Sequence, residues 1–566
     1  MSGGSPPPAR PPDVREALAW RGLGPGLAEA RERGVPVLCL AESAWSTGAQ
    51  RLALVLGREP DTRDLAERAF VPVLVDPLER PDVAARLRWA AATLTGTAGP
   101  PLLALLTSSG RPFLAYCNLW PEGRDPYPSL GSLLRAVSVT ADDGGEAIER
   151  AADDLERRLS APREEAEHTV AGSVVSVFRS AGDERFGGLR ELPKHPRPAL
   201  LWRAFVESGD PRAREHLLRT LDAMQAGGVL DQLDDSFHRC ARDERWVVPH
   251  FEKLAPLNAG LAAVYARAAS VFERPDYLRT AGGAAAFALD ALERGALVIA
   301  ADADHYTWTP KQVYELLEPT LVQAVGLHFN VTRDDSPHVL FRALDVAAMR
   351  DYADEAPSVL AERLERGKAI LRTARSTRPA PDGVPVCAPA WHAETLRWLF
   401  ETAPYGIGVD RAVLDRHLDA VLAGPFDAQR GFARDGRYWL EDQAAIANAC
   451  LAASSARPEM LTRASALIET VLETYVEPHD GAIHDEPRGA PRDDEAPNAS
   501  AREPSRDLVD HVLCAAVPSM VSALRQLATS AAGPSTSVQR QRFELAATRA
   551  ERYHRHAARA ATLGDA

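Results

Sequence analysis

Two different patterns of hydrophobic and polar positions divide the chain at about residue 145. Before that point, short apolar runs at 34–43, 70–76 and 100–117 predict buried strands, the last run being two strands joined by a turn at Ser109-Gly110. Residues 80–94 have helical spacing. Strands that alternate with helices predict a small α/β domain over 14–145.

Beyond residue 145, helical periodicity dominates. A helix at 144–160 and the polar stretch "APREEAEH" predict a connection over 146–184. From 185 to 530 amphipathic or wholly apolar helices recur about every 25 to 40 residues, which favours a ring of helical hairpins. The predicted helices lie at 217–233, 258–273, 277–292, 388–403, 438–455, 460–476 and 508–528.

The ends of the chain and one internal stretch are polar. Residues 1–13 and 531–566 predict tails, the second with a helix, and 478–507 predicts an exposed loop. The N-terminal tail has no apolar core that a signal peptide needs.

The charge of the chain limits its partners. The formal net charge is -14, and no basic block occurs, so neither nucleic acid nor an anionic membrane surface is an expected partner. No segment has the roughly 18 apolar residues of a membrane helix. The six cysteines are scattered and never form CxxC, which favours reduced thiols and a cytoplasmic location.

Familiar catalytic motifs are absent from the chain. No P-loop, GxSxG elbow, HExxH or EF-hand pattern occurs, and no cofactor is expected. The spacing of Asp302 and Asp304 puts two carboxylates on one side of an extended segment, but a lone DxD is also a common polar turn. His238 and His250 with a carboxylate lack a recognisable metal spacing, so no metal site is expected.

The most concentrated chemistry lies in "HRCARDERWVVPHFEKLAPLNA" at 238–259. Imidazoles titrate near neutral pH, so His250 is the best candidate base. Trp246 or Phe251 offers an aromatic face for a sugar ring, and neighbouring charged side chains suit hydroxyl groups. The further candidates for binding or acid–base roles are Asp231, His238, Arg239, Asp243, Glu252, Lys253, Asp302, Asp304 and Trp391.

Several segments resemble one family. "FVPVLVDPLERPDV", "RFGGLRELPKHPRP", "DERWVVPHFEK" and "LEDQA" are similar to the thioredoxin-domain proteins related to spermatogenesis-associated protein 20. The resemblance implies a thioredoxin-like domain followed by an (α/α)6 toroid similar to six-hairpin glycosidases and N-acylglucosamine 2-epimerases. Epimerases of that fold use paired histidines, which would make His238 and His250 the natural pair here.

The resemblance also implies a CxxC motif after the first strand, and this chain departs from it. Ser46 and Ala49 occupy the two cysteine positions, and Cys39 has no partner at that spacing. Dithiol exchange needs one sulfur to attack and a second to resolve the mixed disulfide, so no redox activity is expected. In the toroid, Gln232 replaces a histidine and Leu257 replaces an aspartate of the family pattern.

Three hypotheses follow. The favoured one is a non-catalytic binding or scaffold protein, with a sugar-like small molecule as candidate ligand and an unidentified protein as candidate partner. The second is a carbohydrate-active isomerase or hydrolase that uses His238, His250 and nearby carboxylates such as Glu252. The third is a thiol oxidoreductase, which the missing CxxC opposes. Alternatively, the charged stretch is a structural network whose members satisfy one another and need no ligand.

Overall fold

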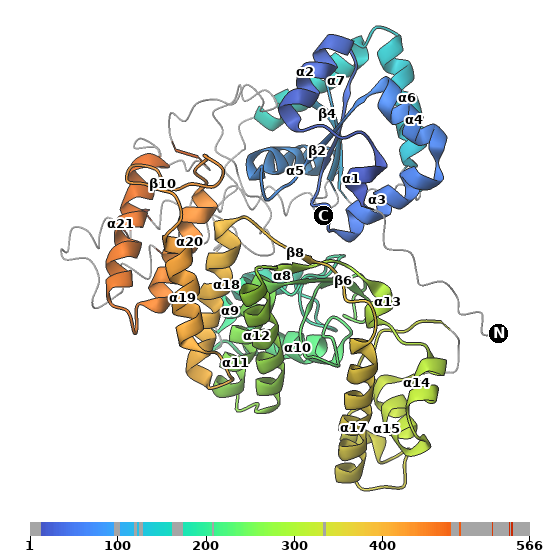
Figure 1. Ribbon diagram of the computed structural model, residues 1–566, viewed down its shortest axis with the longest axis vertical. Coiled ribbons are helices and arrows are strands. Elements are labelled where there is room, and N and C mark those ends of the chain that lie inside the picture. Colours follow the sequence, from blue (N-terminus) through green and yellow to red (C-terminus); the bar gives the residue numbers. More distant parts are fainter. Residues whose placement is uncertain are drawn as a thin grey trace.

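The computed structural model describes residues 13–95, 102–117, 122–123, 128–160, 174–205, 209–331, 336–476, 486–487, 523, 543 and 545–546. Most of the predicted tails, of the linker after residue 160, of the loop at 478–507 and of the helix at 508–528 lie outside these residues. The described part forms two domains (Figure 1).

The N-terminal domain is a four-stranded sheet with helices on both faces. The strands are β1 (Val37–Ala41), β2 (Val71–Val75), β3 (Leu102–Leu106) and β4 (Pro112–Cys117), in the order β2-β1-β3-β4. β1 is parallel to β2 and antiparallel to β3, and β3 is antiparallel to β4. The strands predicted from the apolar runs, and the helix that became α5 (Pro81–Thr95), are confirmed.

Alternation along β1 explains the two layers. Leu38 and Leu40 face one core, whereas Cys39 and its neighbours of the same parity face the other. The first core is covered by α1 (Val14–Ala17), α3 (Thr47–Arg58), α4 (Pro60–Ala69) and α6 (Leu130–Asp142). The second is covered by α2 (Leu23–Arg33) and α5.

The helix expected to connect the domains is part of the N-terminal one. It is α7 (Glu146–Ser160), and it packs on β4 and α5. Its Leu155 and Leu159 are buried in the second core. The domain therefore extends to residue 160, because this helix has an apolar face that the sheet buries.

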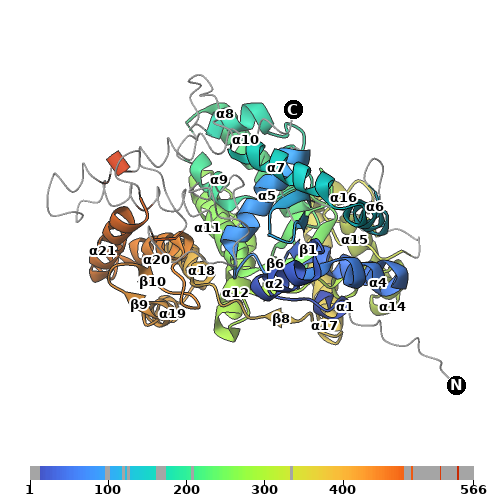
Figure 2. The same ribbon diagram turned by 90° about the horizontal axis from the view of Figure 1, so that it is seen from above.

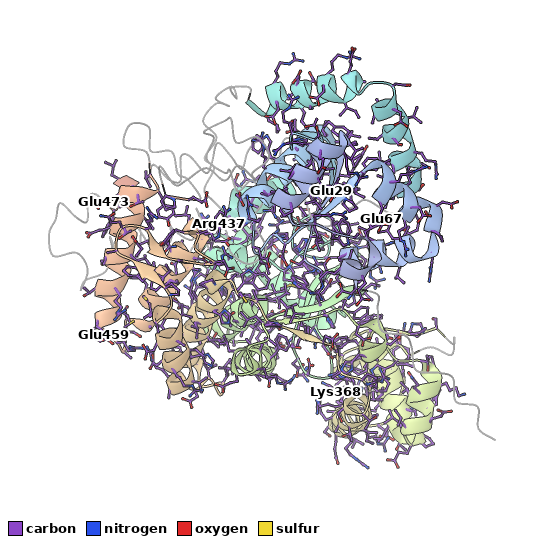
Figure 3. The ribbon with its side chains drawn as sticks, turned by 45° about the horizontal axis from the view of Figure 1, so that its top comes forward. Glu29, Glu67, Lys368, Arg437, Glu459 and Glu473 are labelled. Atoms are coloured by element: carbon purple, nitrogen blue, oxygen red, sulfur yellow. The ribbon has the colours of Figure 1, made fainter. Side chains whose placement is uncertain are left out.

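The helical domain is built from paired helices around one large core. Helices α11 (Ala255–Val271), α18 (Pro389–Thr402) and α20 (Leu440–Ala453) lie side by side and are buried on nearly every face. Helices α12 (Asp276–Arg294), α19 (Arg411–Leu422) and α21 (Glu459–Thr474) pack outside them, the arrangement of a toroid of helical hairpins. Figure 3 marks the two ends of α21 by Glu459 and Glu473.

Three further helices precede these pairs: α8 (Val174–Ala181), α9 (Pro198–Ala204) and α10 (Pro211–Ala226). The helix expected over 217–233 is only partly confirmed. Helix α10 ends at Ala226, so the second half of the expected range is not helical. A Cβ atom on Gly227 would lie 2.3 Å from the Trp246 carbonyl oxygen. Because Gly227 and Gly228 have no Cβ atom, the chain after α10 can pass close to the backbone of Trp246 and Val247, and the helix ends there.

A small sheet and a helical insertion were missed by the sequence analysis. Strands β5 (His238–Ala241), β6 (Pro249–Leu254), β7 (Val298–Ile299) and β8 (Gly383–Val384) form an antiparallel sheet. Between β7 and β8 lie α13 (Ala303–Tyr306), α14 (Pro310–Leu316), α15 (Pro319–Phe329), α16 (Val346–Met349) and α17 (Pro357–Ser376), with cores of their own. The short elements η1 (Ala403–Tyr405), β9 (Phe426–Asp427) and β10 (Gly431–Phe432) complete the domain.

The N-terminal domain sits on the helical domain at the β5–β6 hairpin. Helix α3 packs on β6, and Trp45 and Leu78 pack against the core of the helical domain. Figure 1 shows the N-terminal domain above β6, and Figure 2, seen from above, shows β1 and β6 in the same part of the molecule. The N-terminal domain therefore contacts the helical domain through α3 and through the loops that follow β1 and β2.

Candidate functional site

The charged stretch at 238–259 is a β-hairpin that continues into an inner helix. β5 and β6 are antiparallel, with His238 opposite Lys253 and Cys240 opposite His250, and the register shifts between these pairs. Asn258, in the first turn of α11, accepts from the Phe237 amide (2.6 Å) and donates to the Phe237 carbonyl (2.9 Å). The hairpin is thus fixed to a buried helix at its base.

The turn of this hairpin is braced by Asp243. Its carboxylate accepts from the amides of Arg245 (2.8 Å) and Val248 (2.6 Å). Trp246 has a positive φ of 65°, is fully buried and donates from its indole nitrogen to the Phe186 carbonyl (3.0 Å). Asp243 and Trp246 are therefore occupied in holding the turn, and Trp246 offers no open face to a sugar.

A first group of charged side chains lies around β6 of the hairpin. It consists of Asp231, Asp234, Lys253 and Arg375, with His238 beside them, and is called the Asp231 cluster. Lys253 donates to Asp231 (2.8 Å), to Asp234 (3.0 Å) and to the hydroxyl of Ser236 (2.7 Å). Arg375, which comes from α17, donates to both oxygens of Asp231 at 2.8 and 2.7 Å. Because the three donors of the Lys253 ammonium all have partners here, the cluster satisfies itself without a ligand.

Aromatic rings cover the Asp231 cluster. The Lys253 nitrogen lies 4.6 Å from the centre of the Tyr306 ring, a cation–π distance. His238 contacts both Tyr306 and Phe251 edge-on, with ring centroids 4.7 and 5.4 Å apart. Its Nδ1 lies 3.1 Å from the Phe251 carbonyl oxygen, to which it donates.

The protonation states of the Asp231 cluster are fixed by its partners. Burial raises the pKa of Asp231, but the charges of Lys253 and Arg375 outweigh burial and hold that pKa well below its usual range. Burial, followed by the charge of Lys253, lowers the pKa of His238 to about 3. His238 is consequently a neutral, hydrogen-bonded core group at physiological pH.

A second group, the seam cluster, combines side chains of both domains. It contains Glu42, which follows β1, together with Arg239, His250 and Glu252 of the hairpin. A nitrogen of Arg239 lies 3.4 Å from a Glu252 oxygen, and Glu42 is only 5 % exposed. Burial raises the pKa of Glu42 to about 7, although Arg239 opposes this shift. Burial, followed by the charge of Arg239, lowers the pKa of His250 to about 4.

The two histidines expected as a pair are in different surroundings. His238 is in the Asp231 cluster, whereas the charges around His250 are those of Arg239, Glu252 and Arg242. Among the described residues, no hydrogen bond or ring contact joins His238 to His250. The structure therefore does not bring the two imidazoles together on one substrate atom.

The remaining candidates play mainly structural parts. Asp302 accepts from the His305 amide (3.1 Å) and caps α13, and Asp304 is an exposed residue of that helix. Trp391 is buried and contacts Trp45 of the N-terminal domain edge-on, with ring centroids 6.5 Å apart. Gln232 donates to the Gln225 and Gly227 carbonyls and caps α10.

The positions that would carry the redox cysteines lie at the start of α3. Ser46 caps this helix by accepting from the Ala49 amide (3.0 Å), and Ala49 is fully buried. Cys39 lies inside β1, where burial raises the pKa of its thiol to about 12. A thiol that stays protonated is a poor nucleophile, so this part of the domain has no group for disulfide exchange.

A third contact joins the domains beside the seam cluster. Arg434 donates to the Leu78 carbonyl of the N-terminal domain (2.7 Å) and lies 3.1 Å from Asp442. Asp442 belongs to the "LEDQA" segment and accepts from the Ala390 amide (2.9 Å). The family-like segment therefore positions the start of α18, and with it Trp391, against the other domain.

Sequence reasoning missed several members of these groups. Arg375 stands 144 residues after Asp231, and Glu42 lies in the other domain, so no local spacing could pair them. Tyr306 lies two residues after Asp304, but the DxD pattern points only to the two carboxylates. Asp234 and Ser236 lie three and five residues after Asp231, but no motif marks either of them.

Among the described residues, no three His, Cys, Asp or Glu side chains come together in a way that could hold a metal ion. Within the same residues, no helix has both the length and the apolar character to cross a membrane.

Comparisons with known proteins agree with this fold. The family model Thioredox_DsbH, described as "Protein of unknown function, DUF255", matches residues 13–160. Spermatogenesis-associated protein 20 is 29% identical over 290 residues in Homo sapiens and 28% over 296 in Mus musculus, covering 45% and 46% of this chain. Only 37% of each relative's own length is covered. An uncharacterized protein of Caenorhabditis elegans is 23% identical over 359 residues, covering 55% of this chain and 49% of that protein.

Among solved structures, cellobiose 2-epimerase from Spirochaeta thermophila superposes with a TM-score of 0.27 at 14% identity, covering 63% of this chain and 94% of that one. A likeness at this level says nothing about chemistry. The predicted multidomain fold class, a thioredoxin-like α/β domain followed by a domain of paired helices, is confirmed.

The surroundings of His238 predict a pH dependence of stability. Its pKa is about 3 in the folded chain and about 6.5 when unfolded, so the unfolded state takes up the proton first as the pH falls. Above about pH 6.5 this group leaves the free energy of unfolding unchanged. As the pH falls towards 3 it lowers that free energy, by about 2 kcal/mol at pH 5. His238→Asn keeps a donor for the Phe251 carbonyl but does not titrate.

We expect the urea midpoint of the wild type to fall more steeply than that of His238→Asn between pH 7 and 5. Above pH 7 the two curves should run parallel, which serves as the internal control. Parallel curves across the whole range would contradict the lowered pKa, because they would show that His238 has the same pKa in the folded and unfolded states.

Proposed function

Since this chain is a thioredoxin-domain protein related to spermatogenesis-associated protein 20, we propose that it is a redox-inactive member that works by binding rather than by thiol chemistry. The observation that carries this proposal is the pair Ser46 and Ala49 at the start of α3. One is a helix cap and the other a buried core residue, and neither has a sulfur atom. Because the matched segment covers little more than a third of the mammalian relatives, their activities are not transferred to this chain.

The edge that would present the cysteines has another use. Trp45, next to the cap Ser46, packs against Trp391 and the core of the helical domain. A redox domain needs that edge open for a protein disulfide, whereas here it joins two domains of one chain. This supports a scaffold role in which the N-terminal domain covers part of the helical domain.

A carbohydrate-like small molecule is the proposed ligand. Sugar sites combine an aromatic face with charged groups that exchange hydrogen bonds with hydroxyls. Arg239, His250 and Glu252 bring such groups to the domain boundary, and Trp391 lies at the same boundary. We further propose a protein partner of unidentified chemistry and a cytoplasmic location, the latter from the reduced, scattered cysteines.

The alternative of a sugar-active enzyme has one observation in its favour. Glu42, with a pKa raised by burial to about 7, shares the charged neighbours Arg239 and Glu252 with the unprotonated His250, and a carboxyl poised near neutral pH suits general acid catalysis. The expected partner His238 is instead held in the Asp231 cluster. The binding role therefore remains the stronger proposal.

Redox inactivity predicts a negative result in a disulfide-reduction assay. The protein should not accelerate insulin reduction by dithiothreitol above the uncatalysed rate, since the start of α3 carries no thiol. A thioredoxin sample run in parallel shows that the assay responds. Catalysed turnover by this chain, abolished in Cys39→Ala, would contradict the reading of the N-terminal domain.

Ligand binding predicts a rise in melting temperature, because a ligand that binds only the folded state stabilises it. We expect one class among sugars, sugar phosphates and N-acyl sugars to raise the melting temperature of the wild type but not of His250→Ala. His417→Ala, at another partly buried histidine of the helical domain, is the matched control and should respond like the wild type.

If no sugar shifts the wild type, while His250→Ala alone lowers the melting temperature by several degrees, the carbohydrate part of the proposal is wrong. The scaffold role would then be pursued through protein partners.

A further inference from the structure

The seam cluster contains polar atoms that the protein itself does not satisfy. Glu42 Oε2, Arg239 Nε and His250 Nδ1 are each buried without a hydrogen-bond partner. Glu42 uses its other oxygen to accept from the Ser43 amide (3.1 Å). Native proteins rarely bury polar atoms in this state, because each one loses its hydrogen bond to water. The three residues come from both domains, and Glu42 and His250 both interact electrostatically with the Arg239–Glu252 ion pair.

The chemistry of these atoms selects a class of ligand. Arg239 Nε donates only, the Glu42 carboxylate accepts, and a neutral imidazole nitrogen does either. An anion entering the cluster would meet the carboxylates of Glu42 and Glu252, and a cation would meet Arg239. A neutral molecule with several hydroxyl groups both donates and accepts, so it fits all three atoms without adding charge.

Aromatic groups stand beside the cluster. Trp45 follows Glu42 by three residues in the loop after β1, and its ring is half-buried against Trp391 of α18. Sugar rings commonly lay their apolar C–H face on such side chains. Trp45 would become available as that face if its contact with Trp391 were released.

The two domains must separate for such a molecule to enter. The three unpartnered atoms are shut off from solvent while α3 rests on β6. Their missing hydrogen bonds make the closed contact less favourable than an ordinary interface, which favours opening. Between the domains, the described contacts include the Trp45–Trp391 pair, the electrostatic attraction between Arg239 and Glu42, and the hydrogen bond from Arg434 to the Leu78 carbonyl.

We propose that the seam cluster of Glu42, Arg239, His250 and Glu252 is a binding site for a neutral polyhydroxyl molecule of the sugar class, entered when the N-terminal domain moves away from the β5–β6 hairpin. This inference rests on the proposed binding function and gives that function a place. The N-terminal domain then supplies a ligand-contacting carboxylate and a cover, in place of redox chemistry.

The test compares neutral and charged probes on three proteins. Glucose, mannose and N-acetylglucosamine are set against glucose 6-phosphate and glucuronic acid, with full-length wild type, Glu42→Gln and Glu32→Gln. Glu42→Gln replaces the unpartnered acceptor by a donor of the same shape, and Glu32→Gln makes the same change at an exposed position of α2. Melting temperature and tryptophan emission are both followed, because Trp45 and Trp391 touch across the seam.

We expect a neutral probe to stabilise wild type and Glu32→Gln, with its Kd weakened about tenfold or more in Glu42→Gln. Tryptophan emission should change on binding in the first two proteins. If Glu42→Gln does not fold, Trp45→Leu tests the same site and should weaken the neutral probe to a similar degree.

Each other outcome overturns part of the account. Equal binding to all three proteins would place the sugar elsewhere, so the seam proposal would be wrong while the proposed function stands. Tighter binding of the charged probes would contradict the preference for a neutral ligand. No binding of any probe to wild type would remove both the seam proposal and the carbohydrate part of the proposed function.

Discussion

The pairing of Asp231 with Lys253 and Arg375 is the interaction on which the arrangement of the helical domain's polar end depends. These three groups come from the loop after α10, from β6 and from α17, and they are buried together. Removing a charge from water is costly unless partners satisfy it, so each of these segments must lie where it does for the others to remain charged. The β5–β6 hairpin, the insertion and the loop are thereby held in fixed positions relative to one another.

The domain boundary follows from this fixed hairpin. β6 presents Lys253 to the Asp231 cluster and Glu252 to Arg239 and the N-terminal domain. The same short strand therefore connects a self-satisfied network to one that retains unpartnered atoms. This contrast separates a clamp, around Asp231, from a candidate binding site, around Glu42. The loop beside Ser46 therefore has a structural use that needs no cysteine, since Trp45 packs there against the helical domain.

The sequence predicted most of the elements because their signals are local. The apolar runs became β1 to β4, and the long alanine-rich helices became α11, α12, α18, α20 and α21. The hairpin at 238–254 was not predicted, since its charged residues show no clean alternation and its register shifts midway. The candidate site was found in outline, but not its division into two clusters. That division depends on Arg375 and Glu42, whose distance along the chain leaves no trace in local spacing.

The most direct test of the clamp is the melting temperature of Asp231→Asn, beside Asp304→Asn as an exposed control. The change keeps the shape of the side chain and leaves Lys253 and Arg375 buried without their main countercharge. We predict a loss of about 3 to 5 kcal/mol, or roughly 5 to 10 °C, with the control within about 1 °C of wild type. An unchanged or raised melting temperature for Asp231→Asn would contradict the account. A charged residue that is retained for chemistry commonly costs stability, so its neutralisation leaves the fold as stable or makes it more stable.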